Sequence, residues 1–86
     1  MNGFWRERAV LITGASSGIG RALALELGRH GARVGLFARR AEALEAAAAA
    51  ITDAGGAALV LPGDVTQLAH LKNAVARMET EWGGVD

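Results

Sequence analysis

A cluster of glycines between two apolar segments constrains the fold of this chain more than any other feature. Residues Thr13 to Gly20 read T-G-A-S-S-G-I-G and separate the apolar run Ala9 to Ile12 from an amphipathic stretch that begins at Ile19. An unbroken apolar run is typical of a strand that is buried on both faces of a parallel sheet. A glycine-rich turn between such a strand and a helix is a common place for nucleotide phosphates to bind. The cluster therefore predicts a strand, a phosphate-binding turn and a helix in succession.

The rest of the chain continues this alternation. The first helix is expected from about Gly18 to His30, with Ile19, Leu23 and Leu27 on one face. A second strand is expected over Val34 to Ala38, followed by a helix from Ala41 to Ile51 that ends before Gly55-Gly56 and by a third strand over Ala57 to Leu61. The third helix has Thr66 as its expected N-cap, and its apolar residues at helical spacing are Leu68, Leu71, Val75, Met78 and Trp82. After Gly83-Gly84, a fourth strand is expected to start at Val85-Asp86. Strands that alternate with helices in this way form a parallel sheet with right-handed crossovers and helices on its faces.

Composition excludes several classes of function. Nine basic and nine acidic residues leave no net charge, so neither nucleic acid nor a membrane surface is expected as a partner. The chain has no cysteine, and its two histidines lack nearby ligand partners, so no metal site is expected. Arg6 and Arg8 precede an apolar run that is too short for a signal peptide or a membrane span, which predicts a cytoplasmic location.

The spacing of the glycines distinguishes between phosphate-binding motifs. A P-loop is excluded because Ile19 stands at its second glycine position, and Leu23 stands where the G-x-G-x-x-G pattern needs its third glycine. The pattern present is T-G-x-x-x-G-x-G. Its glycines let the backbone turn sharply and let a pyrophosphate approach the positive end of the following helix. The residues expected to bind the cofactor here are Gly14, Ser16, Ser17, Gly18, Ile19 and Gly20.

These residues resemble the short-chain dehydrogenases/reductases, whose glycine motif is written T-G-x-x-x-G-x-G. Asp64-Val65 is similar to the family's adenine-contacting pair, and Gly84-Val85-Asp86 is similar to the lead-in to its fourth strand. The resemblance extends over nearly the whole chain. It implies an α/β fold with a Rossmann-type doubly wound parallel sheet, truncated to about three strands and three helices. Residues 1–86 would then form a partial NAD(P)-binding domain, the N-terminal part of a longer single-domain enzyme.

The segment after the second expected strand indicates which cofactor is bound. NAD-binding versions of this fold carry an acidic residue about twenty positions after the glycine motif, where it bonds the ribose hydroxyls. The segment here reads Phe37-Ala38-Arg39-Arg40, and arginine can bind a 2′-phosphate through paired charge-assisted hydrogen bonds. NADP is therefore expected in preference to NAD, with Arg39 at the phosphate and Arg40 as the second candidate. The alternative is that both arginines are solvated residues that open a helix.

The resemblance also implies a reaction, in which hydride passes between the nicotinamide and a carbonyl or alcohol carbon while a Tyr-x-x-x-Lys pair handles the proton. The chain has no tyrosine and only one lysine, Lys72, so no catalytic residue is assigned. We expect this chain to be the NADP(H)-binding N-terminal part of an oxidoreductase, and we expect this part to end within the fourth strand. The full-length enzyme is expected to be a homo-oligomer. The alternatives are a stand-alone nucleotide-binding module, half of a two-chain assembly, and a non-catalytic remnant. The identity of the substrate stays open.

Overall fold

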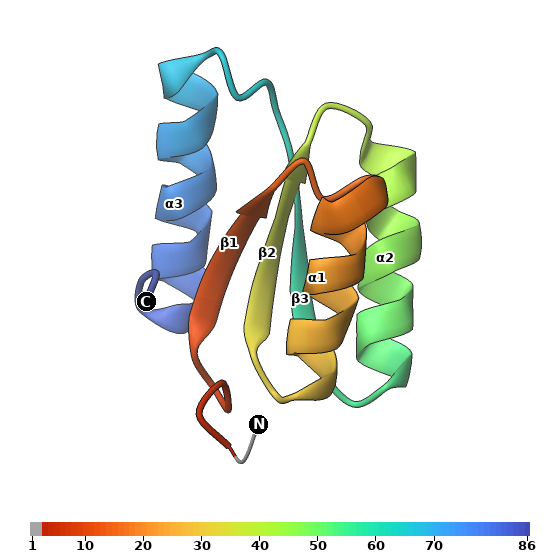
Figure 1. Cartoon of the computed structure of the whole chain (residues 1–86). Helices are drawn as coiled ribbons and strands as arrows, with labels where there is room; N and C mark the ends of the chain where they lie inside the picture. The colour runs from red at the N-terminus through yellow and green to blue at the C-terminus, as the bar shows by residue number, and fades with distance from the viewer. Residues whose placement is uncertain (1–2) are drawn as a thin grey trace.

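The computed structural model describes residues 3–86, and these residues form three strands and three helices in strict alternation. The elements are β1 (Ala9–Thr13), α1 (Gly18–Arg29), β2 (Arg33–Ala38), α2 (Ala41–Asp53), β3 (Ala57–Pro62) and α3 (Leu68–Trp82). Figure 1 shows the strands side by side with their carboxyl ends at the upper edge of the sheet. The predicted order of elements is confirmed.

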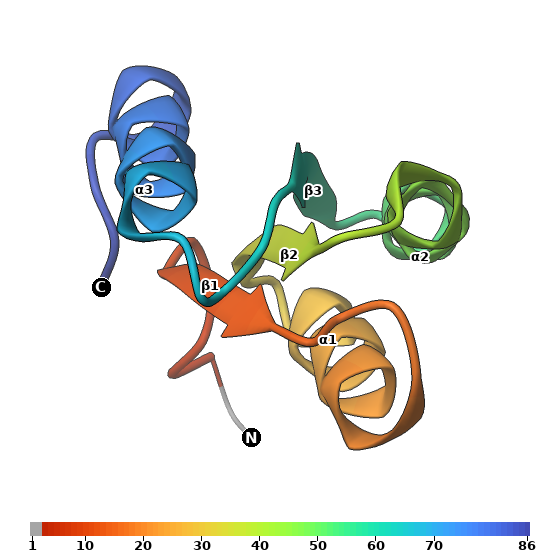
Figure 2. The ribbon, with the colours of Figure 1, turned by 90° about the horizontal axis from the view of Figure 1, so that it is seen from above.

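The sheet is parallel, with the strand order β1-β2-β3 and with β2 in the centre. Val34 of β2 is paired with Val10 of β1 and with Ala58 of β3. Seen from above, α1 and α2 cover one face of the sheet and α3 covers the other (Figure 2). The predicted Rossmann-type architecture is therefore confirmed for the part of the chain that the structure describes.

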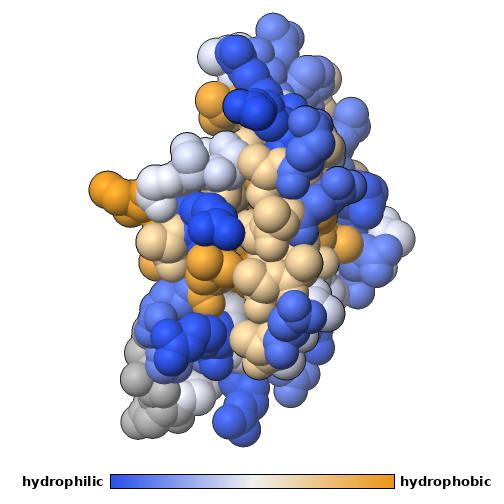
Figure 3. Space-filling model, turned by 90° about the vertical axis from the view of Figure 1, so that its right-hand side faces the viewer, coloured by the Kyte–Doolittle hydropathy of each residue, from blue (hydrophilic) through white to orange (hydrophobic). Residues whose placement is uncertain are grey.

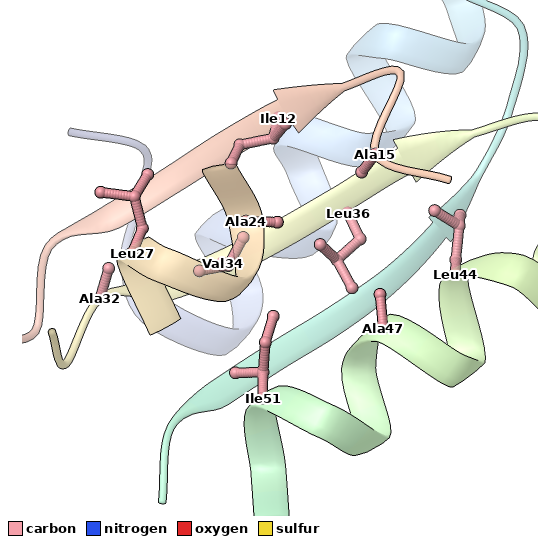
Figure 4. Packing of buried hydrophobic residues seen from close by; sticks show 10 residues of the cluster. All are labelled: Ile12, Ala15, Ala24, Leu27, Ala32, Val34, Leu36, Leu44, Ala47 and Ile51. Atoms are coloured by element: carbon pink, nitrogen blue, oxygen red, sulfur yellow. The ribbon is translucent and has the colours of Figure 1, made fainter. Parts of the chain in front are cut away.

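The larger core cluster lies between the sheet and the helices α1 and α2. Alternate residues of β2, such as Val34 and Leu36, point to this side and are fully buried. Figure 4 shows the packing of the cluster, whose buried members are Ile12, Ala15, Ala24, Leu27, Ala32, Val34, Leu36, Leu44, Ala47 and Ile51. On the outer side of α2, Ala46, Ala49 and Ala50 are exposed. Figure 3 shows a pale, weakly hydrophobic band between blue polar groups on this side of the molecule.

The smaller core cluster lies under α3 on the opposite face. It consists of Ala9, Phe37, Leu61, Ala74 and Met78. A Cβ atom on Gly35 of β2 would come within 2.6 Å of the Met78 sulfur. Because glycine has no side chain, α3 can lie close to the sheet at this position. Phe37 is 1% exposed and reaches the end of the sheet where the site described below is formed.

Two of the predicted helix faces are wrong in detail. In α1, Leu27 is buried as predicted, together with Ala24 and Gly28, but Ile19 and Leu23 are 88% and 49% exposed. The buried face of α1 is turned toward α2, and the two helices lie close together. A Cβ atom on Gly28 would lie 2.8 Å from the Ile51 side chain. In α3, Met78 is buried as predicted, together with Ala74, but Leu68 at the start of the predicted stripe is 65% exposed.

Two of the predicted termini also need correction. The N-cap of α3 is Gln67, because the Thr66 hydroxyl donates to the Asp64 carboxylate instead of capping the helix. Val85 and Asp86 do not form a strand. The Asp86 N–H nevertheless donates to the Ala9 carbonyl oxygen at 2.8 Å, and the Ala9 N–H donates to Asp86 Oδ2 at 2.7 Å. The end of the chain thus lies against the outer edge of β1. Within residues 3–86 no helix is long and apolar enough to cross a bilayer.

Candidate functional site

The carboxyl ends of the three strands form one edge of the sheet, and the loops that leave them surround a cavity of about 160 Å³. Open parallel sheets bind their ligands at this edge. Residues from all three strand-to-helix loops line the cavity, although they lie far apart in the sequence. They are Gly14, Phe37, Ala38, Arg39, Gly63, Asp64 and Val65.

The glycine turn after β1 is shaped by backbone requirements. Gly14 and Gly18 have φ angles of 66° and 60°, which side-chain-bearing residues rarely adopt, and an added Cβ atom at either position would meet nothing within 4 Å. Gly20 is needed for a different reason, since its Cβ atom would collide with the carbonyl oxygen of Gly14. The first turn of α1 therefore lies directly against the end of β1, with open space above the turn.

The N-terminus of α1 is left without a side-chain cap. Ser17 is the N-cap residue, but its hydroxyl makes no hydrogen bond to the helix, and the first turn carries no acidic side chain. The first N–H groups of a helix have no partner inside the helix, and they lie at the positive end of its dipole. The turn itself is tied to β2, because the Ala15 N–H donates to the Phe37 carbonyl oxygen at 3.3 Å. This arrangement can accept an anion beside the glycines.

An ion pair connects the other two loops across the cavity. Arg39 Nη2 lies 3.2 Å from Asp64 Oδ2, and the Arg39 side chain remains 74% exposed. Arg40 is the N-cap of α2, is exposed and does not line the cavity. The structure thus brings Arg39 to the cavity and leaves its neighbour outside it.

The Asp64 carboxylate is stabilised in its charged form. Its Oδ1 accepts the Thr66 N–H at 2.9 Å and the Thr66 hydroxyl at 2.8 Å. The Thr66 backbone hydrogen bond is the largest cause that lowers the pKa of Asp64, followed by the Thr66 hydroxyl, with a smaller contribution from the Arg39 charge. Asp64 therefore keeps its negative charge into the acidic range.

The predicted site residues fall into three groups. Gly14, Arg39, Asp64 and Val65 line the cavity. The adjoining turn and the first residues of α1 contain Ser16, Ser17, Gly18, Ile19 and Gly20. Arg40 is separate from both groups.

Sequence reasoning missed four residues at this edge. Phe37, Ala38 and Gly63 line the cavity, and His70 accepts the Asp64 N–H on its Nδ1 at 2.9 Å. Their positions at the ends of the predicted strands could have identified the first three, since a strand's last residues border such a cavity. His70 carries no local signal, because its role depends on how α3 packs beside the turn.

Comparisons with known proteins agree with this geometry. Residues 8–86 match the family described as short chain dehydrogenase. The chain is 42% identical over 79 residues to a fatty acyl-CoA reductase from Mycobacterium tuberculosis, a match that covers 92% of this chain and 27% of the reductase.

Two solved structures have the same fold over nearly the whole chain. One is L-sorbose reductase from Gluconobacter frateurii complexed with NADPH and L-sorbose, with a TM-score of 0.92 and 31% identity over 100% of this chain and 33% of that one. The other is a short-chain type dehydrogenase/reductase from Mycobacterium marinum, with a TM-score of 0.91 and 39% identity over 99% of this chain and 34% of that one. The chain thus spans about a third or less of each relative's length.

Proposed function

Because this chain belongs to the short chain dehydrogenase family, we propose that it is the NADP(H)-binding part of an oxidoreductase that transfers hydride between NADP(H) and a carbonyl or alcohol substrate. The observation that carries the choice of cofactor is the position of Arg39. It lies at the cavity just after β2, where NAD-binding versions of the fold carry an acidic residue. A carboxylate there would repel a 2′-phosphate, whereas a guanidinium can bind it.

The shape of the site fits a dinucleotide. Open space above Gly14 and Gly18 leaves room for a pyrophosphate, and the uncapped N–H groups of α1 supply donors for it. We assign Ser16, Ser17 and the first residues of α1, Gly18, Ile19 and Gly20, to this part of the cofactor. The exposed Ile19 side chain provides an apolar surface beside the turn.

The cavity beyond the glycine turn fits an adenine nucleoside. Asp64 offers a carboxylate acceptor, and the 56% exposed Val65 side chain offers an apolar surface for a flat ring. Arg39 on the opposite side of the cavity is free of protein on most of its surface, so it can turn from Asp64 to a phosphate group. We assign the adenine end of the cofactor to this cavity and the 2′-phosphate to Arg39, with Arg40 as an exposed second positive charge.

The role of these residues is to bind and orient the cofactor, which supplies hydride chemistry when bound. The chain has no tyrosine, and its single lysine, Lys72, lies in α3. We therefore assign no proton-transferring residue among the cofactor-binding residues. The glycine turn orients the phosphates, and the carboxyl ends of β1 and β2 border the cavity.

The test is a pair of titrations of the protein, expressed at its natural length, with NADPH and with NADH by isothermal calorimetry. We expect NADPH to bind at least about tenfold more tightly, since hydrogen bonds to charged groups contribute about 1.5–3 kcal/mol. The fragments 2′-phospho-ADP-ribose and ADP-ribose should show the same preference, because the difference lies in the phosphate. No saturable binding of either dinucleotide would refute the proposed function, and equal affinities would refute the assignment of NADP.

A further inference from the structure

The turn between β3 and α3, residues 63–67, carries three of the cavity residues, Gly63, Asp64 and Val65. The Gly63 N–H donates to the Ala38 carbonyl oxygen at 2.8 Å, and the Gln67 N–H donates to the Asp64 carbonyl oxygen at 2.9 Å. Between these two bonds, the Asp64 N–H donates to His70 Nδ1 at 2.9 Å. A side chain from the first turn of α3 thus holds the backbone at the residue whose carboxylate faces the cavity.

The backbone of this turn lies close to both β2 and His70. A Cβ atom on Gly63 would lie 2.7 Å from the Phe37 ring and 3.1 Å from the Cβ atom of His70. Gly63 is therefore held between the buried ring of β2 and the first turn of α3. This close approach brings the His70 ring within hydrogen-bonding distance of the Asp64 amide.

We propose that His70 is a positioning residue for the adenine end of the cofactor: its Nδ1 holds the Asp64 amide, and through it the orientation of the Asp64 carboxylate and the Val65 backbone. The effect of this contact on cofactor binding rests on the proposed function. The hydrogen bond between His70 and the Asp64 amide is independent of that function. The bond requires an unprotonated Nδ1, because an imidazolium has only donors and would face another donor. Cofactor affinity therefore falls when the ring takes up a proton.

The groups near the His70 ring come from the turn, from α3 and from β2. On the turn, the Asp64 carboxylate is already occupied by Thr66 and by Arg39 from the loop after β2. On α3 itself, Arg77 lines the same small hollow as His70. The neighbouring element β2 presents the apolar Phe37 ring.

Two variants separate the hydrogen bond from the bulk of the side chain. His70→Asn keeps an acceptor near the position of Nδ1 but does not titrate, and His70→Leu keeps much of the volume but has no acceptor. The dissociation constant of NADPH is measured for both variants and the wild type at pH 8 and pH 5.5. The 2′-phosphate also titrates near pH 6, but it does so identically in all three proteins.

At pH 8 we expect His70→Leu to bind NADPH about threefold to tenfold more weakly than the wild type, and His70→Asn to bind it within about twofold. Between pH 8 and pH 5.5 the wild type should lose more affinity than His70→Asn, because only the wild type carries the imidazole. Unchanged affinity in His70→Leu, or an identical loss with pH in the wild type and His70→Asn, would overturn the inference.

A measurement without cofactor separates this inference from the proposed function. Hydrogen exchange of the Asp64 and Gln67 amides is followed by NMR in the wild type. The ratio of the Asp64 exchange rate to the Gln67 exchange rate should rise from pH 8 to pH 5.5, since the acceptor of the Gln67 amide does not titrate. If the wild type fails to bind NADPH but shows this rise, the positioning contact stands and the proposed function fails. If the Asp64 and Gln67 amides keep the same relative rate, the contact itself is refuted, even if His70→Leu does not fold.

Discussion

The Arg39 guanidinium lies 3.2 Å from the Asp64 carboxylate, and this ion pair joins the loop after β2 to the loop after β3. Both side chains line the cavity at the carboxyl edge of the sheet. Exposed ion pairs contribute little to folding stability, so Arg39 can exchange Asp64 for a phosphate at small cost. Without a ligand, the pair keeps the guanidinium near the place where we propose that the 2′-phosphate binds.

The first prediction concerns this arginine. Arg39→Asp should weaken NADPH binding about tenfold to hundredfold, because a charge-assisted hydrogen bond is replaced by repulsion of the phosphate. NADH has no 2′-phosphate, so its dissociation constant should change much less. Both constants are measured by isothermal calorimetry.

The matched control for Arg39 is its neighbour in the sequence. Arg40→Asp makes the same change of charge at the N-cap of α2, outside the cavity. It should reduce NADPH affinity less than Arg39→Asp does. An equal loss of NADPH and NADH affinity in Arg39→Asp would remove Arg39 from the phosphate site.

The second prediction concerns the glycine turn. Gly20→Ala should destabilise the fold by about 1–3 kcal/mol, because the new Cβ atom collides with the Gly14 carbonyl oxygen and the turn must shift. The same shift should abolish NADPH binding. Urea unfolding measures the first effect and calorimetry the second.

Gly55 provides the control for this substitution, since it lies after α2 with a φ of 91° and nothing within 4 Å of an added Cβ atom. Gly55→Ala should cost about 1 kcal/mol from backbone strain alone and leave NADPH affinity unchanged. If Gly20→Ala binds NADPH as tightly as Gly55→Ala does, the close approach of α1 to β1 is not needed for binding.

The third prediction concerns the ionisation of Asp64. Thr66→Val removes the hydroxyl that donates to the carboxylate and keeps the backbone N–H, so the pKa of Asp64 should rise toward its ordinary value. Thr66→Ser keeps the hydroxyl and should leave the pKa low. A titration of the Asp64 carboxyl by carbon-13 NMR distinguishes them, and an unchanged pKa in Thr66→Val would contradict the assignment of this hydrogen bond.

The sign of the effect on stability follows from the direction of this shift. A carboxyl whose pKa is lower in the folded chain stabilises the fold above its unfolded pKa of about 3.9, and this contribution is lost as the pH falls through the lowered folded value. Thr66→Val should therefore reduce the stability gained from Asp64 at neutral pH. Below both pKa values it should have no effect through this group.

The fourth prediction compares two leucines. Leu44 in α2 is fully buried, and Leu44→Ala should cost about 2–5 kcal/mol by leaving a cavity in the larger core cluster. Leu68 in α3 is 65% exposed, and Leu68→Ala should cost less than about 0.5 kcal/mol. Urea unfolding curves of the two variants test this difference. Similar losses in both would mean that Leu68 is covered in solution.

Local patterns in the sequence were enough to predict the order of the elements. The apolar run before Thr13 and the glycines at 14, 18 and 20 depend on residues within a few positions of one another, so they identify a strand, a turn and a helix directly. The faces of the helices were predicted less well. Periodicity predicted burial of Leu23 and Leu68, but both side chains are largely exposed. Burial depends on how each helix is turned about its axis against its neighbours. The close contacts at Gly28 with Ile51 and at Gly35 with Met78 join residues that are distant in the sequence.

Composition and short segments establish the alternation of strands and helices, the glycine turn, the two arginines in place of an acidic residue directly after β2, and the absence of a tyrosine. Two contacts depend on the folded chain: the pairing of Arg39, and not Arg40, with Asp64, and the hydrogen bond from the Asp64 amide to His70. The sheet decides the first of these contacts, because parallel pairing brings the ends of β2 and β3 to one edge. The second depends on how α3 folds back beside its own preceding turn, where Gly63 lies close to both Phe37 and His70.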